Sequence, residues 1–178
     1  MIGHPVPVPT PKPTYTPTPI TTSTSGFNYP HYSQGDGRWN TEHLGFSEKS
    51  IKSKGCLVSS VASMIAGQGG TINGAAPNPS TMNQWLKKNN GFANGNDFNW
   101  EAVNSLGYKF EGKQTSRSSI TEAVNAGKGV VLHVHGGTHW VLATGVTPTG
   151  YTVMDPGNHL ITSYDFNQVS QAGIFKKK

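Results

Sequence analysis

The chain has 178 residues, 34% of them apolar, which is enough for one domain with a buried core and too few for two full domains. Charged residues make up only 13%, and the formal net charge is +5, which favours contact with anionic partners such as wall polymers, nucleic acid or lipid head groups. No stretch approaches the roughly 18 apolar residues of a membrane span. The single cysteine, Cys56, excludes an internal disulfide framework and a cysteine-rich zinc site.

Residues 5–25 are rich in proline and threonine and contain no acidic residue. Proline fixes the backbone and removes a hydrogen-bond donor, so we predict a polyproline-like linker or extended tail over residues 1–26. A linker joins two things, which suggests an upstream domain or a virion protein along this segment; a disordered tail is the alternative. No signal peptide is visible, so we expect an extracellular or virion-associated protein, or one released by lysis.

The folded domain is expected to occupy residues 27–178, where the composition changes to mixed aromatic residues, glycine and asparagine. Its first predicted helix begins at Cys56. Apolar residues recur at helical spacing over 57–65, and the pattern ends at Gly67. The cysteine is therefore predicted to lie at the start of a helix.

Three further helices are predicted downstream. One runs from Ser80, a candidate N-cap, to a stop signal at 89–91. Two shorter helices are predicted over 100–106 and 120–126, the second ended by Gly127.

The second half of the chain changes to the pattern of strands. Residues 130–135 and 139–146 are β-branched and apolar, and the intervening Gly-Gly-Thr at 136–138 predicts a hairpin. A turn at 147–150 leads to a third predicted strand over 151–154. Helices followed by an antiparallel sheet indicate an α+β domain.

Three residues in these elements are suited to nucleophilic catalysis. A cysteine attacks as the thiolate, which the positive end of a helix favours, and Gly55 before Cys56 allows a tight turn and leaves the approach to the sulfur open. His139 opens a strand after a Gly-Gly turn, and Asp155 closes the next strand. Adjacent strands bring such residues within hydrogen-bonding reach if the register allows, so Asp155 is predicted to fix the tautomer and orientation of His139.

Four stretches of the sequence resemble the C39-like peptidase family: QGDGRW at 34–39, GC at 55–56, THWVLATG at 138–145 and DP at 155–156. The resemblance covers nearly all of 27–178. It implies a papain-like cysteine peptidase fold, with an N-terminal catalytic helix packed on an antiparallel sheet. It also implies Cys56, His139 and Asp155 as the triad, and Gln34 as a side-chain donor of the oxyanion hole beside the backbone N–H of Cys56.

One position departs from the pattern of the family, because Leu57 stands where members often carry a second glycine. We expect it to pack inward on the helix and to leave catalysis intact. Two tryptophans, Trp39 and Trp140, flank the predicted catalytic residues. We predict that they line a substrate groove, with a place in the core as the alternative.

A zinc site is the competing interpretation of the histidines. His133, His135 and His139 have a spacing that can hold zinc with an open position. Against this, Gly136-Gly137 would turn the chain between the second and third ligands, and Asp155 would have no role. The alternative for His133 and His135 is that they are ordinary strand residues.

The sequence therefore predicts a cysteine hydrolase that cleaves amide bonds through an acyl-enzyme, with no metal or organic cofactor. A bacterial wall peptide is the expected substrate, and a phage or bacterial lysin is the expected context, from the linker-plus-hydrolase layout, the positive charge and the range of the family. An inactive papain-like binding module of a virion or cell surface is the main alternative. Nucleic acid is not an expected partner, because the domain shows no stripe of Lys and Arg.

Overall fold

The computed structural model describes residues 20–22 and 26–178. Most of the predicted Pro/Thr segment lies outside these residues. Its described part, β1 (Ile20–Thr22), pairs antiparallel with β2 (Asn28–Pro30). The two strands lie on either side of the predicted boundary between residues 26 and 27. The division into a linker and a domain stays a prediction.

A six-stranded antiparallel sheet forms the centre of the domain, in the order β5-β10-β6-β7-β8-β9. Its strands are β5 (Tyr108–Gln114), β6 (Gly129–Val134), β7 (His139–Val146), β8 (Gly150–Met154), β9 (Ser163–Asp165) and β10 (Gln171–Lys177). The meander β6-β7-β8 confirms the three strands predicted from the sequence. The last strand, β10, lies between β5 and β6 and pairs with both, which was not predicted from the sequence.

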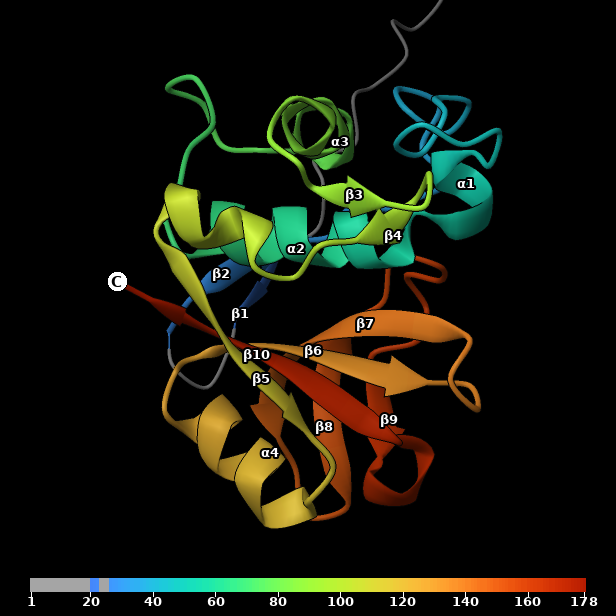
Figure 1. Ribbon diagram of the computed structural model, residues 1–178. Helices are drawn as coiled ribbons and strands as arrows, with labels where there is room; N and C mark the ends of the chain where they lie inside the picture. Colours follow the sequence, from blue (N-terminus) through green and yellow to red (C-terminus); the bar gives the residue numbers. More distant parts are fainter. Residues whose placement is uncertain (1–19, 23–25) are drawn as a thin grey trace, which may run out of the picture.

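Helices cover both faces of the sheet (Figure 1). The helix α2 (Cys56–Gly67) packs on β7 and β6 from one side, and α4 (Arg117–Asn125) packs on the same strands from the other. The remaining elements are α1 (Ile51–Lys54), α3 (Pro79–Lys88), β3 (Phe92–Ala93), β4 (Asp97–Phe98), and the 3-10 helices η1 (Ala102–Leu106) and η2 (Phe166–Gln168). Among the described residues, no helix has the length and apolar character needed to span a membrane.

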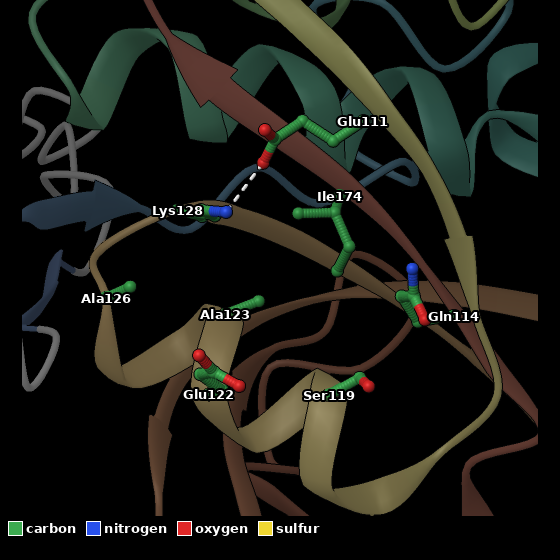
Figure 2. A pocket seen from close by; sticks show the side chains of 8 residues that line it. All are labelled: Glu111, Gln114, Ser119, Glu122, Ala123, Ala126, Lys128 and Ile174. Atoms are coloured by element: carbon green, nitrogen blue, oxygen red, sulfur yellow. Dashed lines mark ion pairs between the residues drawn. The ribbon is translucent and has the colours of Figure 1, made fainter.

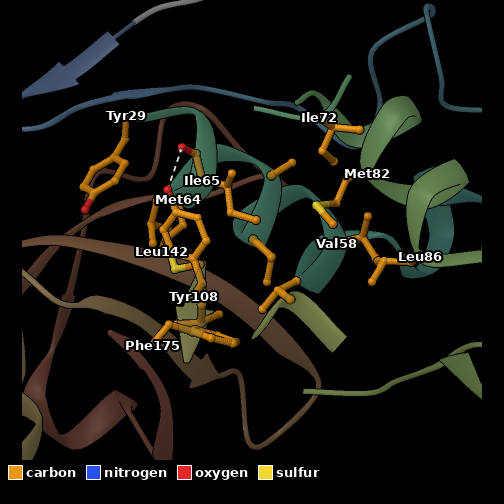
Figure 3. Packing of buried hydrophobic residues seen from close by; sticks show 14 of the residues in the cluster. Tyr29, Val58, Met64, Ile65, Ile72, Met82, Leu86, Tyr108, Leu142 and Phe175 are labelled. Carbon is orange, nitrogen blue, oxygen red and sulfur yellow. Dashed lines mark hydrogen bonds between the residues drawn. The ribbon is translucent and has the colours of Figure 1, made fainter. Parts of the chain in front are cut away.

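The helix α2 is buried on nearly all sides because it lies between α3 and the sheet (Figure 1). Its apolar residues Val58, Met64 and Ile65 are at most 2% exposed and belong to one cluster with residues of α3, β5 and β10 (Figure 3). Burial of side chains this size stabilises a fold by about 1.5–3 kcal/mol each. The core thus fixes the position of the residue at the start of α2, which is Cys56.

Helix starts differ from the sequence predictions by a few residues. The helix α3 begins at Pro79 and its N-cap is Asn78, whose side chain accepts a hydrogen bond from the backbone N–H of Thr81. The prediction of Ser80 as the cap was wrong, because asparagine followed by proline already forms a stronger start. Trp100 lies outside η1 and packs in an aromatic cluster instead.

Candidate active site

Cys56 is the first residue of α2, as predicted, and it is 8% exposed. The preceding Gly55 is the C-cap of α1 and the N-cap of α2. A Cβ at Gly55 would lie 2.5 Å from the backbone oxygen of Ile51, which no ordinary contact permits. The glycine therefore allows two helices to meet at the cysteine.

His139 and Asp155 come together from neighbouring strands. His139 is the first residue of β7, and Asp155 follows the last residue of β8, which runs antiparallel to β7. The Nε2 atom of His139 lies 2.6 Å from Oδ1 of Asp155. The side chain of Cys56 also acts on His139 and favours its charged form, so the structure brings the three predicted triad residues together.

The charges of His139 and Asp155 stabilise each other. Burial acts to lower the pKa of His139, but the hydrogen bonds to Asp155 and to Cys56 outweigh it and raise the pKa to about 9. Burial acts to raise the pKa of Asp155, and the bonds it accepts from His139 and Tyr164 hold it below its usual value. A positive imidazolium facing a negative carboxylate is therefore the stable state at neutral pH.

Asp155 is 1% exposed, and groups other than His139 also hydrogen-bond to it. The backbone N–H of Gly157 donates to Oδ1 at 2.8 Å, and the hydroxyl of Tyr164 donates to Oδ2 at 2.6 Å. The ring of His31 bonds the main-chain oxygen of Asp155 through Nε2 at 2.7 Å. The sequence analysis missed Tyr164 and His31, because neither has a local motif that points to an aspartate far away in the chain.

Gln34 lies between the Asp155 loop and the helix α1. Its backbone N–H donates to the oxygen of Pro156 at 2.9 Å, and its side-chain Nε2 donates to the backbone oxygen of Lys52 at 2.8 Å. Its Oε1 atom is buried and has no hydrogen-bond partner among the described residues. An amide nitrogen carries two hydrogens, so one remains for another acceptor.

A pocket of about 330 Å³ adjoins Cys56 and contains Trp140 but not Trp39. Its walls combine apolar and aromatic side chains with one lysine and one aspartate; they include Lys54, Leu57, Val58, Asp97, Phe98, Trp100, His133 and Trp140. Trp39 instead is 2% exposed and donates its Nε1–H to the oxygen of Ser33. The structure thus brings Trp140 to the predicted groove and places Trp39 in the core, where its ring covers apolar neighbours.

The family of the chain follows from the similarity of its sequence to a known family. A sequence model of the Peptidase C39-like family matches residues 27–176, which is most of the chain. The chain belongs to the Peptidase C39-like family. No curated protein sequence matches it.

Two solved structures are similar to this C39-like chain. The peptidase domain of Streptococcus ComA, a bifunctional ABC transporter involved in a quorum sensing pathway, is 12% identical, with 70% of this chain and 93% of that domain covered and a TM-score of 0.51. A double glycine motif protease from an AMS/PCAT transporter, solved with a leader peptide, is 14% identical, with 69% and 84% covered and a TM-score of 0.47. The α+β papain-like peptidase fold predicted from the sequence is thereby confirmed.

The departure of this C39-like chain at Leu57 has a visible consequence. The side chain is half-buried and lines the pocket beside Cys56. It packs against the main core at the same time, which is where it was expected to lie. Leucine at this position therefore forms part of the pocket wall beside Cys56.

The alternative zinc site is wrong for this C39-like domain. Over residues 26–178, no three His, Cys, Asp or Glu side chains form a group that can hold a metal ion. His133 stacks on Trp140 at 3.9 Å between ring centroids, whereas His139 pairs across the hairpin with Val134. His133 also bonds the side chain of Gln171, His135 bonds Tyr164 and His139 bonds Asp155, so the three rings hold three different partners.

A second pocket lies on the opposite face of the sheet, between α4 and the strands β5 and β10 (Figure 2). An ion pair of 2.7 Å between Lys128 Nζ and Glu111 Oε1 crosses one side of it. It shares no lining residue with the pocket at Cys56. It is therefore separate from the candidate active site.

Proposed function

We propose that this protein is an active cysteine peptidase in which Cys56 is the nucleophile, His139 the general acid and base, and Asp155 the group that orients His139. The single observation that carries the proposal is that Cys56, at the start of α2, lies with His139 and the buried carboxylate of Asp155, to which His139 is hydrogen-bonded. A histidine whose pKa is raised to about 9 is protonated at neutral pH and can stabilise a thiolate beside it.

The geometry supports acyl transfer in two steps. The Cys56 sulfur forms a bond to the carbonyl carbon of the substrate, the C–N bond breaks, and the imidazolium of His139 gives its proton to the leaving amine. Water then attacks the thioester while His139 takes a proton from it, and the carboxylic acid leaves as the sulfur is regenerated. Asp155 stays ionised throughout and stabilises the imidazolium.

The oxyanion of each tetrahedral intermediate needs hydrogen-bond donors. We assign this role to the backbone N–H of Cys56 at the start of α2 and to the second N–H of the Gln34 amide. The bond from Gln34 to Lys52 supports the assignment, because it holds the amide beside the segment that leads into Cys56. A donor fixed in advance costs no reorganisation when the negative charge develops.

For the substrate, we propose peptides of the bacterial cell wall, with the protein acting as a phage or bacterial lysin. Two features support this choice. The pocket beside Cys56 carries Lys54 and Asp97 together with apolar walls, which suits short peptides that bear both carboxylates and amines. The net charge of +5 favours approach to an anionic wall.

The test is digestion of purified cell wall, followed by chemical labelling of the newly released amino and carboxyl ends. We expect new peptide ends with the wild-type protein and none with the Cys56→Ala protein, folded as shown by circular dichroism. A wild-type protein that cleaves a general peptide substrate but no wall would refute the wall substrate alone. Cleavage of neither would favour the inactive binding module.

A further inference from the structure

The second oxygen of the Asp155 carboxylate is occupied by a residue outside the triad. Tyr164, in the edge strand β9, is 4% exposed and donates its hydroxyl proton to Oδ2 of Asp155 at 2.6 Å. The first oxygen, Oδ1, already faces His139 and the N–H of Gly157. Each oxygen of the buried carboxylate is thus satisfied, one of them by a single tyrosine.

Tyr164 is in turn held by His135, in the turn between β6 and β7. The Nε2 atom of His135 lies 3.0 Å from the Tyr164 oxygen. A tyrosine has one hydroxyl proton, and here Asp155 accepts it. The Tyr164 oxygen is therefore the acceptor, and His135 donates an N–H to it.

The backbone of the turn holds His135 in place for this contact. Its φ angle is 53°, in the left-handed region, which histidine adopts more readily than most residues that have a Cβ atom. The turn is closed by the Thr138 hydroxyl, which donates to the oxygen of His135 at 2.8 Å. The histidine ring is thereby directed toward Tyr164, although the residue itself is exposed to solvent.

We propose that Tyr164 and His135 are positioning residues that fix the Asp155 carboxylate for catalysis, through a line of hydrogen bonds running from an exposed turn to His139. The proposal rests on the function proposed above. Neither residue touches the reacting atoms. Both act by holding the orientation and the charge of Asp155.

Loss of the Tyr164 hydroxyl leaves a buried carboxylate oxygen without a donor, which is costly for the ionised form. The pKa of Asp155 would then rise, because burial already acts to raise it and one of the bonds that lower it is gone. Ionisable groups around Asp155 come from several elements: His31 before α1, Cys56 of α2, His135 of the β6–β7 turn, His139 of β7 and Tyr164 of β9. His159 lies beside His31, with ring centroids 6.2 Å apart.

The first experiment compares Tyr164→Phe with Tyr151→Phe in the full chain. Tyr151 is a matched control: it is 1% exposed, lies opposite Tyr164 in the sheet, and bonds Thr121 instead of Asp155. We expect Tyr164→Phe to lower kcat/KM about tenfold, the size of one hydrogen bond to a charged group, and to move its acid limb to higher pH. Equal losses and unshifted pH profiles in both variants would overturn the proposal.

The second experiment tests His135 through His135→Asn, because asparagine tolerates the left-handed backbone. We expect a smaller loss than in Tyr164→Phe, and no added loss when the two changes are combined, since His135 acts through the Tyr164 hydroxyl. Additive losses would show that His135 has an independent role and would contradict the line of hydrogen bonds.

A readout without substrate separates this inference from the proposed function. The ¹³C resonance of the Asp155 carboxyl follows its protonation, and we expect its pKa to rise in Tyr164→Phe and to stay unchanged in Tyr151→Phe. An unchanged value in Tyr164→Phe would refute the positioning role even if the enzyme is active. A raised value in a protein that cleaves nothing would support the positioning and refute only the peptidase.

Discussion

His139 is the residue on which the charge balance of the site depends. It is hydrogen-bonded to the carboxylate of Asp155, and the side chain of Cys56 also acts on it. Both contacts favour its protonated form, against the effect of burial. The proton that the leaving amine requires is therefore already in place before substrate binds.

The pKa of His139 is the first prediction at this scale. We expect the imidazole to titrate near 9 in the wild-type protein and at a lower value in Cys56→Ala, because one of the bonds that stabilise the charged ring is lost. A raised pKa adds stability below the ordinary value of 6.5, and this contribution is lost as the pH rises through about 9. NMR titration of the histidine ring protons measures the pKa of His139. An ordinary pKa in the wild-type protein would show that Asp155 and Cys56 do not stabilise the charged ring.

The role of Gln34 gives a second prediction. Gln34→Ala removes one proposed oxyanion donor and should raise the activation barrier by about 2.7–4 kcal/mol in kcat, with the fold intact. Asp155→Asn should leave partial activity, since Asp155 orients His139 and takes no part in bond formation. Steady-state kinetics on one soluble peptide compares them, and a Gln34→Ala enzyme with wild-type kcat would remove Gln34 from the oxyanion hole.

At the scale of elements, the site is an assembly of one helix start and the ends of two adjacent strands. The helix α2 carries Cys56, β7 carries His139, and the loop after β8 carries Asp155. That loop is tied to the segment before α1, because the N–H of Gln34 donates to the oxygen of Pro156. Small changes in the loop should therefore reach the catalytic histidine.

Gly157 in this loop is the place to test that expectation. A Cβ at Gly157 would lie 3.0 Å from Cε1 and 3.1 Å from Nε2 of His139, so alanine must push the ring aside. We expect Gly157→Ala to lower kcat/KM by up to about tenfold, since the ring must give by a few tenths of an ångström and a displacement of 1 Å costs about 100-fold. Gly37→Ala is the control, because no atom lies within 4 Å of its Cβ, and equal activity of the two variants would contradict the contact.

The sequence predicted the elements that carry the triad better than those around them. A run of apolar residues identified α2, and β-branched runs around Gly136 and Gly137 identified β6 and β7. The four residues of α1 are too few to show a period. The strand β5 alternates aromatic and charged residues from Tyr108, a signal that was available and missed.

The residues of the site also divide into those that a local sequence pattern identifies and those that it does not. Cys56, His139 and Asp155 were found because each stands next to a recognisable element boundary, and the structure brings them together. The contacts of Tyr164 and His135 depend on how the edge strand β9 meets the β6–β7 turn. Such pairing across the fold leaves no local pattern in a single sequence.

At the scale of the whole molecule, the excess positive charge is the feature that bears on the proposed wall substrate. Lys109, Lys128 and Lys176 gather around Glu111 near the edge strand β5 and its neighbour β10. The hydrogen bond from Lys128, helped by the charges of the other two lysines, holds the pKa of Glu111 below its usual value. The group retains a net positive charge away from Cys56.

Salt should therefore affect two substrates differently. We expect activity on whole wall to fall between 50 and 500 mM NaCl, a range chosen because the screening length drops to well below about 10 Å above 0.1 M, while cleavage of a neutral soluble peptide changes little. The Lys109→Gln, Lys176→Gln double variant should weaken wall activity at low salt and leave the peptide rate unchanged. Equal salt sensitivity of both substrates would rule out a role for the positive charge.

The covalent intermediate is the most direct test of the central claim that Cys56 attacks the substrate. We would mix the protein with a slowly cleaved peptide or ester, quench with acid, and measure the mass of the intact chain and of its proteolytic fragments. The account predicts an added mass equal to the acyl part of the substrate, on the fragment with Cys56, present in Gln34→Ala and absent in Cys56→Ala. A folded Cys56→Ala protein that cleaves the same substrate at the wild-type rate, without any adduct in either protein, would contradict it.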